Sequence, residues 1–119
     1  MMKAREELGF KRQIFFIDYG GWDHHDELLN NQSAMLGVVS QAFGEFYYAL
    51  QELELLDQVT TFSISEFART LTSNGNGTDH AWGGNVMVMG GNQVNGGRIY
   101  GDYPDLSLGN DMMLWDGVL

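Results

Sequence analysis

The chain reads VTTFSISEFART over residues 59–70, where a β-branched run passes directly into a polar cluster. Residues 59–64 are rich in valine, threonine and isoleucine, and this composition predicts a buried strand. Residues 65–70 then place Glu66 and Arg69 just beyond the end of that strand. In parallel sheets, ligands bind at the carboxyl ends of the strands, so this junction is a candidate functional edge.

Upstream lie a second predicted strand and a long predicted helix. Residues 13–18, QIFFID, are apolar at successive positions, as in a strand covered on both faces. Residues 26–55 carry apolar side chains at steps of three and four, which predict one amphipathic helix. Its aromatic stripe predicts core packing and consists of Phe43, Phe46, Tyr47 and Tyr48. Strand, helix and strand form a βαβ unit, whose two strands are expected to be parallel.

Downstream, residues 72–77 form a glycine and asparagine loop, and residues 85–91 predict a third strand. Residues 96–101 predict a short strand after a turn, and the chain is turn-rich and polar from residue 102. We therefore expect a single α/β domain over residues 1–119, with a mostly parallel sheet and flanking helices.

The composition excludes several classes of function. The chain has 119 residues, a net charge of −10 and no cysteine. Nucleic acid is not an expected partner, because binding phosphates needs clustered lysine and arginine. Without cysteine there are no disulfides and no thiolate metal sites. No apolar run approaches the roughly 18 residues that span a bilayer, so no membrane partner is expected, and residues 1–7 lack the apolar core of a signal peptide.

All three histidines lie in two short acidic segments, GGWDHH at residues 20–25 and GTDH at residues 77–80. Carboxylate oxygen and imidazole nitrogen are the ligands that zinc and similar cations accept in the absence of cysteine. The candidate metal-binding residues, each at or after a predicted strand end, are Asp23, His25, Glu66, Asp79 and His80. The alternatives are a solvated polar loop at residues 20–25 and an ordinary turn at residues 77–80.

Glu66 and Arg69 also allow two interpretations. They can form an ion pair with each other, or Glu66 can bind the metal while Arg69 binds an anionic substrate. No G-x-S-x-G segment and no locally spaced Ser-His-Asp set is present. The candidate nucleophiles are hydroxyl side chains near the predicted strand ends, namely Ser63, Ser65, Thr70 and Thr78.

Four segments carry a family resemblance: GGWDHH (20–25), SEFART (65–70), GTDHAWGG (77–84) and GGRIYGDYP (96–104). In order and spacing they resemble the DUF1501 family, which is placed with the alkaline phosphatase/sulfatase-like superfamily, and the resemblance covers roughly residues 8–108. The family pattern is close to GWDTH and SEFGRT, so that His24 and Ala68 depart from it and His25 falls on the family histidine.

The resemblance implies a partial alkaline-phosphatase-like α/β/α sandwich with metal ligands at the carboxyl edge of the sheet. It implies a divalent metal, with zinc as the first choice and manganese, calcium or magnesium as alternatives. In a full-length relative the implied activity is hydrolysis of a phosphate or sulfate ester, and Arg69 would bind the small anionic substrate. Asp23 and His25 would serve one metal, with Glu66, Asp79 and His80 completing the set.

Family members are several hundred residues long and typically carry a twin-arginine signal for export to the periplasm. The superfamily nucleophile comes from an N-terminal half, so the resemblance implies that this chain is either the C-terminal portion of a larger metallohydrolase-like domain or a degenerate short gene product. The chain alone has no recognisable nucleophile. The alternative function is a non-catalytic, metal-stabilised binding or assembly module. An exposed sheet edge would then pair with another chain, and a homo-oligomer is one form of such an assembly.

Overall fold

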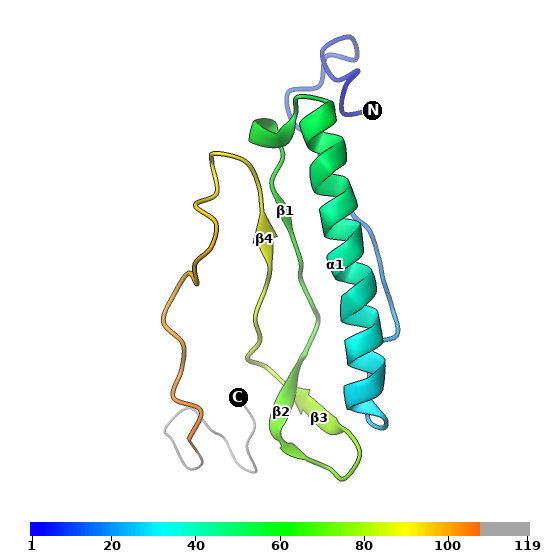
Figure 1. Ribbon diagram of the computed structural model, residues 1–119, viewed down its shortest axis with the longest axis vertical. Coiled ribbons are helices and arrows are strands. Elements are labelled where there is room, and N and C mark those ends of the chain that lie inside the picture. The colour runs from blue at the N-terminus through cyan, green and yellow to red at the C-terminus, as the bar shows by residue number, and fades with distance from the viewer. Residues whose placement is uncertain (108–119) are drawn as a thin grey trace.

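A long helix and two small antiparallel sheets make up the computed structural model, which describes residues 1–107 (Figure 1). In chain order the elements are α1 (Leu28–Glu52), the 3-10 helix η1 (Leu56–Gln58), β1 (Thr61–Phe62), β2 (Ala68–Ser73), β3 (Thr78–Ala81) and β4 (Val88–Met89). The expected mixture of helix and strand is therefore confirmed. The structure measures 54 × 29 × 24 Å along its principal axes.

Helix α1 falls within the predicted range of residues 26–55. Its C-terminus is closed by a Schellman motif, in which the amide of Leu55 donates to the carbonyl of Leu50 (2.8 Å) and that of Glu54 to Gln51 (3.1 Å). Leu50 and Leu55, the two positions whose apolar contact accompanies this motif, are both buried. The helix thus ends in the turn that lies between the buried residues Leu50 and Leu55.

Strands β1 and β4 pair antiparallel, with Thr61 opposite Met89 and Phe62 opposite Val88. The turn after β4 is fastened to η1 by the carboxylate of Asp57, which accepts hydrogen bonds from the backbone amide (2.6 Å) and side-chain amide (3.1 Å) of Asn92. A side chain at Gly91 would collide with Asp57, so this close approach requires glycine. These contacts keep β4 beside β1.

Strands β2 and β3 form a hairpin that the sequence did not predict. Ala68 lies opposite Ala81 and Arg69 opposite His80, and the register shifts before Ser73 reaches Thr78. Two hydrogen bonds between Asn74 and Gly77 close the turn between the strands. The backbone amide of Asn74 donates to the Gly77 carbonyl (3.1 Å), and the side-chain oxygen of Asn74 accepts from the backbone amide of Gly77 (3.1 Å). Residues 72–77, expected to form a loop alone, therefore supply the end of β2 and the tight turn of the hairpin.

The prediction of a mostly parallel sheet is wrong for the described residues, and nothing in them supports a partial alkaline-phosphatase-like sandwich. Both sheets between residues 1 and 107 have two strands, and both are antiparallel. Residues 13–18 and 96–101, predicted as strands, have no strand partner within this range. A strand with two apolar faces needs neighbours that cover both, and the small sheets of this chain do not provide them. The predicted irregular region continues past residue 107, outside the described residues.

Few side chains are buried. Within residues 1–107 the buried apolar residues are Leu50, Leu55 and Ala81. The aromatic stripe on α1, predicted to be core, is only half-buried, with Tyr48 exposed. The chain exposes 9412 Å², whereas a compact protein of its mass exposes about 6,500 Å². Much apolar surface is thus available for contacts beyond the chain itself. No helix in residues 1–107 is both long enough and apolar enough to cross a membrane.

Candidate metal centre

The candidate site lies where the β2–β3 hairpin meets residues 22–25, the segment that leads into α1. The two parts are joined at the hairpin turn: the carbonyl of Asn76 accepts a hydrogen bond from the amide of Leu28 (3.2 Å), the first residue of α1. The side-chain amide of Asn76 also binds the carboxylates of Asp26 and Glu27. The turn therefore satisfies a free amide at the helix start, which has no side-chain cap of its own.

Gly77 allows the hairpin to approach this segment closely. A Cβ atom at position 77 would collide with the backbone carbonyl groups of His24 and His25. Only glycine can therefore occupy this position without displacing the backbone. This approach brings residues 79 and 80 of β3 within reach of residues 23 and 25.

Three side chains converge through one donor atom each. The Asp23 Oδ1 atom lies 2.8 Å from the Nε2 atom of His80 and 2.9 Å from that of His25. The two Nε2 atoms are 3.3 Å apart. All three ligand atoms lie within 4.8 Å of one another, on side chains that are about half exposed. The site is thus open to solvent and to an incoming ion.

Asp79 holds His25 from the other side of its ring. The Asp79 Oδ1 atom lies 3.2 Å from His25 Nδ1 and accepts a 2.9 Å hydrogen bond from the side-chain amide of Asn74. A carboxylate on Nδ1 fixes the proton there and leaves Nε2 free as a ligand, which is how histidines at metal sites are commonly oriented.

Aromatic stacking holds the His80 ring. It stacks on Phe67, with ring centroids 3.9 Å apart and an interplanar angle of 6°. The His25 ring stacks on it more loosely, at 5.1 Å and 29°. These contacts limit rotation of the imidazole and keep Nε2 directed at Asp23. Phe67 was not singled out from the sequence, although it stands inside the SEFART segment two residues before Arg69.

Arg69 links the hairpin to the 22–25 segment. Its guanidinium donates to the carbonyl of Thr78 (2.7 Å), the carbonyl of Trp22 (2.9 Å) and the carboxylate of Asp23 (2.9 Å). The side chain is only 15% exposed. The structure therefore gives Arg69 a positioning contact with Asp23, and its predicted contact with an anionic substrate stays a prediction.

Both carboxyl groups of the site are shifted towards the charged form. The hydrogen bond from His80 lowers the pKa of Asp23, Arg69 and the charge of His25 act in the same direction, and partial desolvation opposes them. The hydrogen bond from Asn74 lowers the pKa of Asp79, and His25 adds to this effect against partial desolvation. A cation would therefore meet ionised carboxylates over most of the pH range.

Glu66 and His24 lie apart from this group of side chains. Glu66 is exposed, and its side chain makes no hydrogen bond or ion pair within residues 1–107, so the structure does not bring it to the other candidates. His24 is buried, with its Nε2 atom unpartnered inside the described region, and its ring packs edge-on against Trp22.

The donor set fits a divalent cation. On a tetrahedron with metal–nitrogen bonds of about 2.0–2.1 Å, ligand atoms lie about 3.3–3.4 Å apart. The two Nε2 atoms already have this separation, at 3.3 Å, and the Asp23 oxygen, 2.8 and 2.9 Å from them, needs to move outward by roughly 0.5 Å. One carboxylate and two imidazoles leave at least one coordination position for water or substrate.

Comparison with known proteins gives one result. The model of the family described as "Protein of unknown function (DUF1501)" matches residues 1–113, which is nearly the whole chain. No curated protein and no solved structure matches. The GWDHH and GTDH segments that build the site both lie inside the matched range. The chain therefore belongs to the DUF1501 family.

Proposed function

We propose that Asp23, His25 and His80 bind one divalent cation, and that this centre serves the hydrolysis of phosphate or sulfate esters in a protein of the alkaline phosphatase/sulfatase-like type. The observation that carries the proposal is the convergence of one carboxylate oxygen and two imidazole nitrogens within 4.8 Å, from segments more than fifty residues apart. Zinc is the first choice for this nitrogen and oxygen set, with manganese, calcium and magnesium as alternatives.

A bound cation would supply a Lewis acid for the ester group. The residues around it prepare the site in three ways. Asp79 orients His25 through Nδ1, Phe67 holds the plane of His80, and Arg69 fixes Asp23. The guanidinium also places a positive charge next to the site, which favours an anionic ester over a neutral one.

Isothermal titration with zinc, followed by hydrolysis assays, tests this function. We expect one zinc ion per chain and a loss of binding in His80→Ala, whose ring supplies a donor atom. The assays use p-nitrophenyl phosphate and p-nitrophenyl sulfate with the zinc-loaded chain. Hydrolysis that disappears in His80→Ala would support the complete proposal, and failure of the wild-type chain to bind zinc, manganese, calcium or magnesium would refute it.

A metal-stabilised binding module without catalysis is the second candidate, and the hydroxyl groups favour it. Ser65 donates to the carbonyl of Phe67, Thr70 donates to that of Thr72, and Ser63 accepts from the amide of Met87. The Thr78 hydroxyl is buried. None of these four has a hydrogen bond to the three ligand side chains. Zinc binding without hydrolysis of either ester would support this second function for the chain on its own.

A further inference from the structure

We propose that residues 13–18 join two copies of this chain, pairing as antiparallel β-strands across a twofold axis between Phe15 and Phe16. This surface is separate from the candidate metal centre, and the inference does not depend on the proposed function. It rests on three features of the segment: an unpaired backbone, exposed apolar side chains, and a sequence that is complementary to itself.

The backbone of this segment is free to pair. From residue 11 to residue 21 no backbone amide or carbonyl makes a hydrogen bond within the described residues. In Figure 1 the segment runs as an irregular stretch towards the start of α1 and joins neither sheet. A row of free amides and carbonyls on an apolar segment is a template for another strand.

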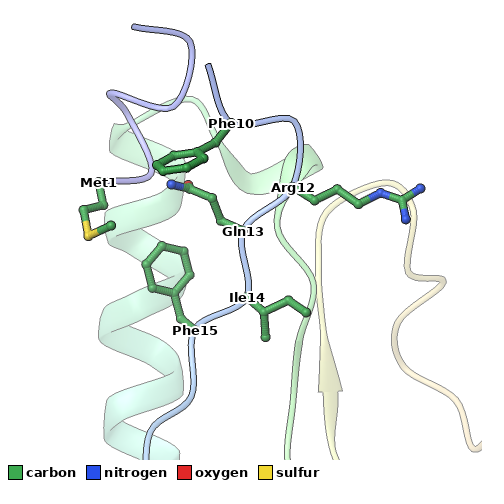
Figure 2. A pocket seen from close by; sticks show the side chains of 6 residues that line it. All are labelled: Met1, Phe10, Arg12, Gln13, Ile14 and Phe15. Atoms are coloured by element: carbon green, nitrogen blue, oxygen red, sulfur yellow. The ribbon is translucent and has the colours of Figure 1, made fainter. Parts of the chain in front are cut away.

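The side chains of the segment are exposed to an unusual degree. Ile14 is 97% exposed, Phe16 75% and Ile17 89%, while Phe15 is 46% exposed. Figure 2 shows Ile14 and Phe15 on opposite sides of the backbone, as in a strand. Ile14 and Phe15 both line a shallow hollow with Met1 and Phe10, and Ile14 nevertheless stays almost fully exposed (Figure 2). The chain's own residues therefore cover the segment only in part.

The apolar core of the segment, IFFI, reads the same in both directions. An antiparallel pair centred between Phe15 and Phe16 places Ile14 opposite the Ile17 of the other copy, and Phe15 opposite its Phe16. Aromatic and β-branched pairs of this kind stabilise antiparallel strands, and both copies contribute the same surface, as a twofold interface requires. A second copy of the chain is therefore the partner that fits.

The flanking charges select the antiparallel direction. In this register Gln13 lies opposite the Asp18 of the other copy, within hydrogen-bonding reach, and Lys11 lies diagonal to the same carboxylate. A parallel arrangement would instead place Lys11 beside Lys11 and Asp18 beside Asp18, and like charges opposite each other are unfavourable.

Exposed apolar side chains are available for such a contact, since Ile14, Phe16 and Ile17 are all at least 75% exposed. The segment lies outside α1 and both sheets, so substitutions in it should leave the described elements intact.

Sedimentation equilibrium in the presence of EDTA, which prevents association through bridging metal ions, tests the contact. The wild-type chain is expected to sediment at twice the 13.3 kDa of one chain. Phe16→Lys should weaken dimerisation at least tenfold, because it places two charges at the centre of the paired strands. The matched control is Leu29→Lys, on a side chain that is 83% exposed on α1, and it should dimerise as the wild type does.

Cross-linking through introduced cysteines tests the register, since the chain has none of its own. A mixture of Ile14→Cys and Ile17→Cys chains, carrying tags of different mass, should be joined by a short thiol-reactive cross-linker into dimers with one chain of each kind. Either variant alone should cross-link at least tenfold less. Efficient cross-linking of Ile14→Cys with itself would indicate parallel strands and overturn the proposal.

A wild-type chain that stays monomeric at concentrations up to 100 μM would also overturn the proposal. It would show that residues 13–18 do not pair with a second copy of the chain. So would a dimer that Phe16→Lys does not weaken, provided that circular dichroism shows the helix content unchanged. The zinc experiments above do not affect either outcome, because EDTA is present throughout.

Discussion

Glu66 and His80 show how far single residues could be interpreted from the sequence. Asp23, His25, Asp79 and His80 were grouped with Glu66 by ligand chemistry and by their place at predicted strand ends, and the structure brings these four together. Glu66 stands apart: it lies at a bend before the start of β2, and its exposed side chain makes no hydrogen bond or ion pair within residues 1–107. Phe67 and Arg69, which follow it in the same segment, both reach the site. Residue types alone do not show which members of the SEFART segment do so.

Substitution of Asp23 should change how the stability of the chain depends on pH. The pKa of its carboxyl group is lowered in the folded state, mainly by His80, from an unfolded value near 3.8. A group of this kind stabilises the fold above its unfolded pKa, and the effect is lost as the pH falls through the folded pKa. Urea unfolding between pH 5 and pH 2 should therefore show a shallower loss of stability for Asp23→Asn than for the wild type.

Asp102→Asn is the matched control, because its exposed carboxylate makes no hydrogen bond or ion pair within residues 1–107. This variant should follow the wild-type pH profile. Identical profiles for Asp23→Asn and the wild type would show that the contacts of Asp23 with His80 and Arg69 do not stabilise the fold.

Gly77→Ala should separate the hairpin turn from the 22–25 segment. The added methyl group would meet the backbone of His24 and His25, which cannot move aside as a flexible side chain would. We expect a loss of about 1–3 kcal/mol in the free energy of unfolding, measured by urea denaturation, together with weaker zinc binding. Gly20→Ala, where a Cβ atom meets nothing within 4 Å, should change neither quantity. Equal effects of the two substitutions would contradict the close approach at Gly77.

At the scale of elements, the helix was predicted well and the strand pairing was not. The apolar period of α1 depends on local sequence, so its bounds were found to within a few residues at each end. Strand pairing depends on which distant segments meet, and the predicted βαβ order of elements favoured parallel strands, which residues 1–107 do not contain. The β2–β3 hairpin was missed because its turn, closed by Asn74 and Gly77, was interpreted as part of a longer loop.

The end of α1 offers a test of how the helix is terminated. Glu54 adopts a left-handed backbone conformation with φ 58°, at the position of the Schellman motif that usually holds glycine. Replacing it with glycine removes the cost of a Cβ atom in this conformation. Glu54→Gly should therefore raise the free energy of unfolding by about 0.5–1 kcal/mol in chemical denaturation.

Ala42→Gly is the matched control for this prediction, since residue 42 is exposed in the interior of the helix. There, glycine should lower the stability by about 1 kcal/mol. If both glycine substitutions destabilised the chain, the termination of α1 at Glu54 by this motif would be wrong.

At the scale of the whole molecule, the structure combines a small core with a site whose side chains are joined by several hydrogen bonds. The apolar content that predicted a substantial core lies largely on the surface, because α1, the two sheets and residues 13–18 do not enclose one another. Composition gives the amount of apolar surface, and its burial depends on what it packs against. The candidate site was more predictable than the core, because glycine-flanked Asp and His pairs keep their chemistry whichever way the strands pair.

The central claim is that Asp23, His25 and His80 form a metal site, and thermal unfolding with and without zinc tests it most directly. With zinc at about 100 times its dissociation constant, binding to the folded chain adds about 2.7 kcal/mol, which should raise the Tm by ~10 °C. Glu66→Ala should show the same rise, because Glu66 lies outside the three ligands. His80→Ala should show almost none. A wild-type Tm indifferent to zinc, or an equal rise in His80→Ala, would contradict the account.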